Sequence, residues 1–163
     1  MKTLLVMRHG KSSWADEGVD DHERPLKGRG KRSAKRIGEE LKRRDLVPDR
    51  IVTSTAERAS ETATRTAKAC GFEGQLDRTR DLYFTGPDGY LRTLVERAQD
   101  SEARVMLVGH NPDCEDLVER LSGVREQITT ANLACIDFDV DAWEDVVTTR
   151  GTLRFVLRPR ELR

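Results

Sequence analysis

Short apolar runs alternate along the chain with longer segments in which apolar residues recur at helical spacing. Each run is too short for an ordinary helix and is rich in aliphatic residues, as is typical of buried strands. The runs predict strands at residues 4–7, 50–53, 75–78, 104–108, 134–140 and 153–157. We expect the strand at 75–78 at a sheet edge, and the last two strands as antiparallel partners near one end of the sheet.

The longer segments carry one apolar stripe on an otherwise charged surface, which is the pattern of an amphipathic helix. They predict helices at residues 29–44, 56–70, 90–98 and 113–121. Gly71 directly follows the second helix, where a C-cap glycine is expected, and Pro112 precedes the fourth, where proline suits a helix start. The alternation of strands and helices predicts an α/β fold, a three-layer α/β/α sandwich with a mainly parallel central sheet.

Three connections carry turn signals. The acidic stretch up to Glu23, which contains Gly18, and the aromatic segment 81–89 are expected to be loops. Residues 24–26 should form an extended or a turn element, because Pro25 disfavours a helical conformation at the residue before it. Residues 139–145 are expected to form the turn between the last two strands.

The composition fits one folded domain spanning residues 1–163, because 163 residues suffice for a good core and no linker or repeat interrupts them. Charged residues make up 36% of the chain, with 29 basic and 29 acidic residues, and aromatic residues only 5%. The balanced charge does not suggest a nucleic-acid or membrane partner. The many Lys and Arg of residues 29–44 are interpreted as a solvated helix face.

The three cysteines, Cys70, Cys114 and Cys135, are widely spaced and odd in number, so neither a disulfide framework nor a metal site is predicted. We expect Cys114 to be buried on an apolar helix face. His22 lies in a charged loop without a motif and is expected at the surface. Because the chain begins without a signal-peptide pattern and has no apolar run of membrane-spanning length, a cytoplasmic location is the default expectation.

Candidate chemistry gathers at predicted strand ends. Arg8 and His9 end the first strand, and Gly10 permits the chain to leave strand geometry there. Arg58 follows the second strand, at the opening of a helix. His110 follows the strand at 104–108. Because ligands of open α/β sheets bind beyond the carboxyl ends of parallel strands, we expect these side chains to meet.

Three motifs together resemble the signature of the histidine phosphatase superfamily. They are Arg8-His9-Gly10, the segment 52–63 with Ser54-Thr55-Ala56-Glu57-Arg58, and the segment 106–112 with Gly109-His110-Asn111-Pro112. The order and spacing are also those of the family, and the small size and residues 23–26 are similar to SixA-type phosphohistidine phosphatases. The resemblance covers nearly the whole chain and implies a phosphoglycerate mutase-like fold.

The resemblance implies that His9 is the nucleophile and becomes phosphorylated, and that Arg8 and Arg58 clamp the phosphoryl group. His110 would donate a hydrogen bond to the phosphoryl oxygens as charge builds. The residue chemistry agrees, since a phosphoryl group carries about two negative charges at neutral pH and the guanidinium fork binds phosphate bidentately. A backbone carbonyl near Gly10 or Ser13 is expected to fix the His9 tautomer.

Two hydroxyl residues and three aromatic residues near the motifs each allow two interpretations. Ser54 and Thr55 are candidate donors to the phosphate, although N-capping the following helix is the expected duty of one of them. Trp14, Tyr83 and Phe84 either line the mouth of the site or pack over the sheet edge.

The general acid is missing from its usual place. Larger family members acting on phosphate monoesters carry a Glu after the second Arg segment, whereas Asp81 is the one nearby carboxylate here and is more simply a loop residue. An alkoxide leaving group needs an acid, but phosphohistidine leaves as imidazole, whose conjugate-acid pKa is about 6.5. The departure therefore favours phosphohistidine as substrate.

These observations predict a metal-independent and cofactor-free phosphatase acting on phosphohistidine in a partner protein, with Arg8, Arg58 and His110 as the cationic field. One alternative is a phosphatase for small phosphomonoesters such as sugar or nucleotide phosphates. A second is a non-catalytic phosphate-sensing module, which the intact His9 and His110 disfavour. A mutase is disfavoured because the loops are too short to enclose a second phosphate.

Overall fold

A single six-stranded sheet organises the computed structural model, which describes residues 1–14 and 18–162. The strand order is β3-β2-β4-β1-β5-β6. The strands are β1 (Lys2–Arg8), β2 (Arg50–Ser54), β3 (Asp77–Thr79), β4 (Arg104–Gly109), β5 (Leu133–Phe138) and β6 (Thr152–Leu157). Strands β1 to β4 run parallel, and β5 is antiparallel to both of its neighbours, β1 and β6. The mainly parallel sheet and the antiparallel pair at its end are confirmed.

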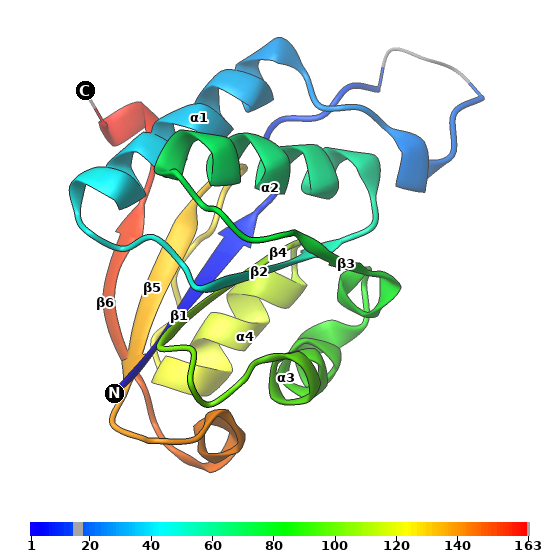
Figure 1. The fold of residues 1–163 in the computed structure, drawn as a ribbon. Helices are drawn as coiled ribbons and strands as arrows, with labels where there is room; N and C mark the ends of the chain where they lie inside the picture. Colours follow the sequence, from blue (N-terminus) through cyan, green and yellow to red (C-terminus); the bar gives the residue numbers. More distant parts are fainter. Residues whose placement is uncertain (15–17, 163) are drawn as a thin grey trace.

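Helices cover both faces of the sheet, with α1 and α2 on one side and α3 and α4 on the other (Figure 1). Their bounds are α1 (Gly28–Arg43), α2 (Glu57–Cys70), α3 (Gly86–Arg97) and α4 (Asp113–Ser122). The predicted three-layer α/β/α sandwich is therefore confirmed. Gly71 ends α2 in the left-handed conformation, with φ 80°, as its predicted C-cap role requires.

The central strand β1 is apolar because both of its faces are covered. Leu4 and Val6 point into the core beneath α3 and α4, whereas Leu5 and Met7 point into the core beneath α1 and α2. Alternation of side chains along a strand splits the run between two cores. The predicted first strand is thus a fully buried one.

Helix α3 begins earlier than predicted. It starts at Gly86, inside the segment 81–89 that we expected to be a loop. Pro87 lies in its first turn, where the missing N–H costs nothing, and the Gly86 N–H donates to Asp113 Oδ2 at 3.2 Å. A residue from a distant helix therefore supports the additional turn.

Two segments differ in their bounds from the prediction. Strand β3 begins two residues after the expected start at 75, and it lies at the sheet edge as predicted. The expected turn at 139–145 runs into a 3₁₀ helix, η3 (Trp143–Thr148). Trp143 fixes this helix, because it is 1% exposed and its indole N–H donates to the Glu102 carbonyl at 2.8 Å.

Residues 24–26 are extended as predicted, and Leu26 pairs with Ser12 in an isolated antiparallel bridge. The acidic loop before them contains the 3₁₀ helix η1 (Asp21–Glu23), while its residues 15–17 lie outside the described residues. All three cysteines are buried and free, Cys114 among them. Over the described ranges, no helix combines the length and the apolar character that crossing a bilayer requires.

Candidate active site

Three strand ends bring the predicted site residues to one edge of the sheet. In the parallel pairing of β1 with β4, Arg8 lies opposite Gly109, and in that of β2 with β4, Thr53 lies opposite Val108. The residues that follow, among them His9, Ser54 and His110, therefore leave the sheet together.

His9 leaves strand geometry where the glycine was expected to allow it. Its backbone N–H still donates to the Gly109 carbonyl at 3.0 Å, but its ring turns back and Nδ1 lies 2.7 Å from the Gly10 carbonyl oxygen. A carbonyl only accepts, so Nδ1 carries the proton and Nε2 keeps its lone pair. A Cβ at Gly10 would lie 2.9 Å from the Gly30 carbonyl oxygen, so only glycine fits this turn.

The pKa of His9 is lowered to about 4, first by burial and then by the neighbouring guanidinium groups of Arg58, Arg8 and Arg24. The hydrogen bond to the Gly10 carbonyl opposes this shift without cancelling it. At pH 7 only about one imidazole in a thousand is protonated at such a pKa. His9 is therefore neutral, the state in which its Nε2 is nucleophilic.

His110 faces His9, with ring centroids 5.3 Å apart. Its Nε2 lies 2.9 Å from Ser54 Oγ, and its backbone N–H donates to the Tyr90 hydroxyl at 2.9 Å. Ser54 Oγ also accepts the Ala56 N–H at 3.2 Å, and we assign its hydroxyl proton to the contact with His110 Nε2. The His110 proton is thereby assigned to Nδ1, a buried atom with no partner among the described residues.

Burial and the neighbouring His9 and Arg58 lower the pKa of His110 to about 2. His110 is therefore a neutral hydrogen-bond donor and not the cation that the sequence suggested. The two histidines therefore add no positive charge to the site.

Arg58 is 1% exposed and is held by the loop that precedes α1. Its Nη1 donates to the Asp21 carbonyl at 2.5 Å, and its Nη2 donates to the Asp21 carboxylate at 2.9 Å. Burial alone would raise the pKa of Asp21, but hydrogen bonds from Tyr83, Arg58 and Arg24 outweigh it and hold the pKa well below its usual range. An ionised carboxylate thus occupies the outer edge of the guanidinium.

Arg24 supplies a third guanidinium that sequence reasoning did not assign. It is 8% exposed, donates to Ser12 Oγ at 2.8 Å and pairs with Asp21 at 3.0 Å. The signal was present, because Arg24 stands in the segment that resembles SixA-type enzymes, but only its packing against the site reveals the charge. Asp21 was also missed, because its acidic stretch carries no motif and only the folded chain places it against Arg58 and Arg24.

The two histidines and the three arginines meet in one pocket of about 350 Å³. The pocket is lined by Arg8, His9, Lys11, Ser12, Trp14, Asp21, Arg24, Arg58, Phe84, His110, Asn111 and Thr130. Asp21 is the single carboxylate in this set, which covers described residues only. Arg8 Nε and Arg58 Nε, like His110 Nδ1, are buried donors without a partner in the described part of the chain.

Aromatic side chains frame the pocket. Phe84 stacks on His110 with centroids 4.6 Å apart, and Trp14 covers the Arg24 guanidinium at 3.4 Å. Both are exposed, by 49% for Phe84 and 74% for Trp14, so they form the rim. Tyr83 does not line the pocket and instead donates its hydroxyl proton to Asp21 at 2.7 Å.

Asp81 is exposed and does not line the pocket, in keeping with its simpler interpretation as a loop carboxylate. Two other expectations were wrong. Neither Ser54 nor Thr55 caps α2, whose N-cap residue is Ala56, because the Ser54 hydroxyl is engaged by His110. His22 is half-buried and not at the surface, because η1 places its ring edge-on against Tyr83, with centroids 4.6 Å apart.

No group of three or more His, Cys, Asp or Glu within residues 1–14 and 18–162 has the arrangement of a metal site. The pocket combines a neutral imidazole whose Nε2 keeps its lone pair, three guanidinium groups and a neutral N–H donor. Such a set suits a dianionic group that accepts an attacking nitrogen.

Comparison with known proteins decides the family. The family model of the histidine phosphatase superfamily, branch 1, matches residues 4–134, which include all three motifs. The chain belongs to the histidine phosphatase superfamily. The predicted resemblance is confirmed, and with it a phosphatase class that works without a metal ion.

Among solved structures, the chain is similar to a proposed SixA phosphohistidine phosphatase from Nakamurella multipartitia. The identity is 28%, the TM-score is 0.85, and the match covers 97% of this chain and 96% of the other. A corresponding protein from Agrobacterium tumefaciens is 30% identical with a TM-score of 0.81, covering 97% and 98% of the two chains. These matches confirm the SixA-type resemblance.

A relative without an assigned activity is also similar. An uncharacterized chloroplastic protein of Arabidopsis thaliana is 28% identical over 158 residues, covering 92% of this chain and 72% of its own length.

Proposed function

We propose that this protein is a phosphohistidine phosphatase that acts on a phosphorylated protein through a covalent phosphohistidine at His9. One observation carries the choice of substrate. The single carboxylate among the described residues of the pocket, Asp21, is held ionised by Arg58, Arg24 and Tyr83 and therefore has no proton to give. Similarity to SixA-type structures supports the same choice.

In the first step His9 Nε2 attacks phosphorus, forming a P–N bond as the P–N bond of the substrate breaks. The substrate ring, protonated at its other nitrogen, keeps the electron pair of that bond as a lone pair and leaves as neutral imidazole. In the second step a water oxygen attacks phosphorus, the bond to His9 Nε2 breaks and returns its electron pair to the ring, and inorganic phosphate leaves. A ring protonated in this way departs without an acid from the enzyme, because the nitrogen that leaves has a conjugate-acid pKa of only about 6.5.

The remaining groups bind and stabilise the phosphoryl group. Arg8 and Arg58 each have an unpartnered buried Nε–H, and Arg24 adds a third positive charge. His110 donates from Nδ1 to a phosphoryl oxygen, and Ser54 acts on it as a positioning residue from outside the pocket. Donors fixed before the reaction stabilise the developing charge without reorganisation.

We further propose that residues 1–163 act as one domain in a cytoplasm-like compartment, on a partner that is neither nucleic acid nor membrane and without a cofactor. Asp81, exposed and remote from the pocket lining, is assigned no catalytic role.

The leaving group tests the proposal. Phosphoramidate and phosphohistidine should be hydrolysed with a metal chelator present, whereas alkyl phosphates should be at least about a hundredfold poorer, because an acid typically contributes ~10²–10⁴. Asp81→Asn should change kcat/KM for phosphohistidine by less than about threefold, well below the yield of a general acid. The measurement is kcat/KM of the wild type and of this variant on both substrate kinds.

If the wild type hydrolyses alkyl phosphates as fast as phosphoramidate, and Asp81→Asn abolishes only the hydrolysis of alkyl phosphates, the protein is a small-molecule phosphomonoesterase and this proposal is wrong. Binding of phosphate with no turnover of any substrate would instead support the sensing module.

Ser54→Ala should lower kcat for phosphoramidate about tenfold while changing KM little, because the hydroxyl sets the His110 tautomer without touching the substrate. Ser54→Thr keeps the hydroxyl and should restore most of kcat, which a mere packing defect at Ser54→Ala would not predict. Thr55→Ala is the matched control, since the Thr55 hydroxyl has no partner in the described part of the chain. If Ser54→Ala keeps the kcat of the wild type, the Ser54 hydroxyl does not position His110 for catalysis.

A further inference from the structure

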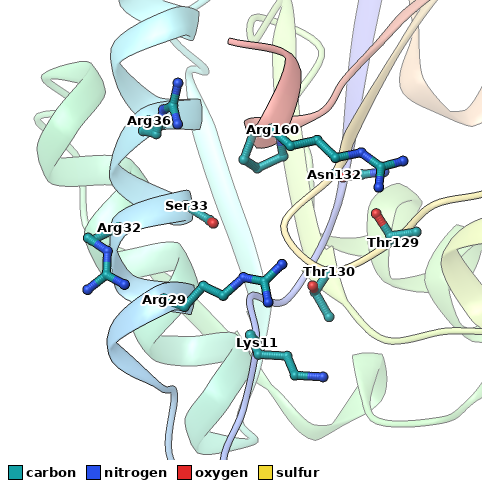
Figure 2. Close-up of a pocket in the computed structure, with 10 residues that line it drawn as sticks. Lys11, Arg29, Arg32, Ser33, Arg36, Thr129, Thr130, Asn132 and Arg160 are labelled. Atoms are coloured by element: carbon teal, nitrogen blue, oxygen red, sulfur yellow. The ribbon is translucent and has the colours of Figure 1, made fainter. Parts of the chain in front are cut away.

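A second pocket, of about 420 Å³, adjoins the active site and is strongly basic. It lies between α1, the segment before β5 and the 3₁₀ helix η4 (Pro159–Glu161). Figure 2 shows Arg29 extending from α1 toward Thr130, Lys11 near them, and Arg160 extending over Asn132 and Thr129. Five of its ten lining residues are Lys or Arg and none is Asp or Glu, although the whole chain carries equal numbers of acidic and basic residues.

The positive charges of this pocket are not neutralised by the part of the protein that the structure describes. Lys11, Arg29 and Arg160 make no ion pair with any described residue, whereas Arg43 and Arg44, at the other end of α1, both pair with Glu40. Uncompensated cations concentrated at one place produce a local positive potential that attracts anions. The cations at the start of this helix lie on the solvated face that the sequence predicted, and they differ from those at its end in having no carboxylate partner among the described residues.

The basic pocket and the active site share a wall. Lys11 and Thr130 line both pockets. The Lys27 N–H donates to the Lys11 carbonyl at 2.8 Å, and a Cβ at Gly30 would lie 2.4 Å from the same carbonyl oxygen. The first turn of α1 is thus pressed against the segment that follows His9, and its cations lie beside the active-site pocket.

We propose that this pocket binds acidic side chains of the phosphoprotein substrate beside its phosphohistidine. This assignment rests on the proposed function and names a feature of the partner, a carboxylate-rich surface around the phosphorylated residue.

The form of the pocket favours a protein surface over a second phosphate of a small molecule. Arg29 and Arg36 stand seven residues apart on α1, about 10 Å along its axis at 1.5 Å per residue. The lysine and the four arginines of the lining are all exposed, in contrast to Arg58 in the active site, which is 1% exposed. Exposed, spread-out cations suit several carboxylates on a partner surface and act mainly by steering its approach.

Two synthetic phosphohistidine peptides test the proposal, one with glutamates flanking the phosphohistidine and one with glutamines at the same positions. At about 0.05 M salt we expect kcat/KM of the wild type to favour the glutamate peptide by about tenfold, and at about 0.5 M salt the preference should largely vanish. In the double variant Arg29→Gln/Arg160→Gln the preference should fall to about twofold or less, with phosphoramidate hydrolysis unchanged.

The double variant Lys35→Gln/Arg92→Gln is the matched control. It removes the same amount of charge from exposed positions that line neither this pocket nor the active site, and it should keep the wild-type preference. Equal rates on both peptides in the wild type, or a preference that persists in Arg29→Gln/Arg160→Gln, would overturn the proposal.

Binding of the unphosphorylated glutamate peptide, measured by fluorescence anisotropy, tests the pocket without catalysis. If phosphoramidate is not hydrolysed, the proposed function fails, while tighter binding of the glutamate peptide that depends on Arg29 and Arg160 still supports the acidic-surface assignment. A single-stranded oligonucleotide that binds through the same two residues more tightly than the glutamate peptide would assign the pocket to nucleic acid instead.

Discussion

Replacing His9 by alanine is expected to lower kcat/KM for phosphoramidate by at least about 10⁴-fold, the scale of losing a covalent nucleophile. In the wild type, Nδ1 is fixed by the Gly10 carbonyl and Nε2 is left unprotonated in a pocket of guanidinium groups. Rapid quench with labelled substrate should therefore trap about one acid-labile phosphate per protein, located on His9. The alanine variant should trap none.

His22→Ala is the control for this variant, since it removes a half-buried histidine of the same region that does not line the pocket. It should label normally and lose little activity. A wild-type protein that turns over substrate at full rate without labelling His9 would exclude the covalent route, and so would a His9→Ala variant with undiminished activity.

The pH profile reports on the same imidazole. Because the pKa of His9 is lowered to about 4, its nucleophilic form is complete from about pH 5 upward, where a histidine of ordinary pKa near ~6.5 would be mostly protonated. After correction for titration of the substrate, we therefore expect kcat/KM to fall as the pH drops through about 4, and to stay nearly constant around pH 6.5. A limb near 6.5 that belongs to the enzyme would mean that His9 is not desolvated in solution.

The strand ends could be predicted because their cause is local. A run such as Leu4-Leu5-Val6-Met7 is typical of a strand that has a hydrophobic core on each face of the sheet, and Gly10 indicates where the chain leaves that strand. Parallel strands present their carboxyl ends at one edge, so Arg8, Arg58 and His110 were expected to meet, and in the structure they line one pocket. Their catalytic roles stay predictions.

The rest of the site depends on contacts between distant segments. Asp21 lies in an acidic stretch with no periodicity. Only the folded chain reveals that its carboxylate accepts hydrogen bonds from Arg58, Arg24 and Tyr83 at once. The Gly86 start of α3 depends likewise on Asp113. The basic pocket was hidden because an overall charge of zero says nothing about where the charges gather.

Arg58→Ala should lower kcat/KM by about 10²–10³-fold, the usual cost of removing one preorganised charge-assisted donor. Arg58 is the most deeply buried cation of the pocket. Its Nε–H has no partner among the described residues, and Asp21 fixes the guanidinium by accepting hydrogen bonds from Nη1 and Nη2. Arg58→Lys keeps the charge but not the planar fork, so it should recover only part of the loss. The inhibition constant of inorganic phosphate should rise in parallel, because the same guanidinium binds this product.

Arg78→Ala and Arg80→Ala are the matched controls, since both residues are exposed arginines of the neighbouring β3 and η2 segments that do not line the pocket. Each should cost less than about threefold, in line with the small worth of exposed charges. Because removing Arg58 also leaves Asp21 without its buried partner, thermal unfolding must be measured beside activity. A folded Arg58→Ala protein with no greater loss than the two controls would reduce Arg58 to an anchor for the Asp21 loop and leave Arg8 and Arg24 as the phosphate clamp.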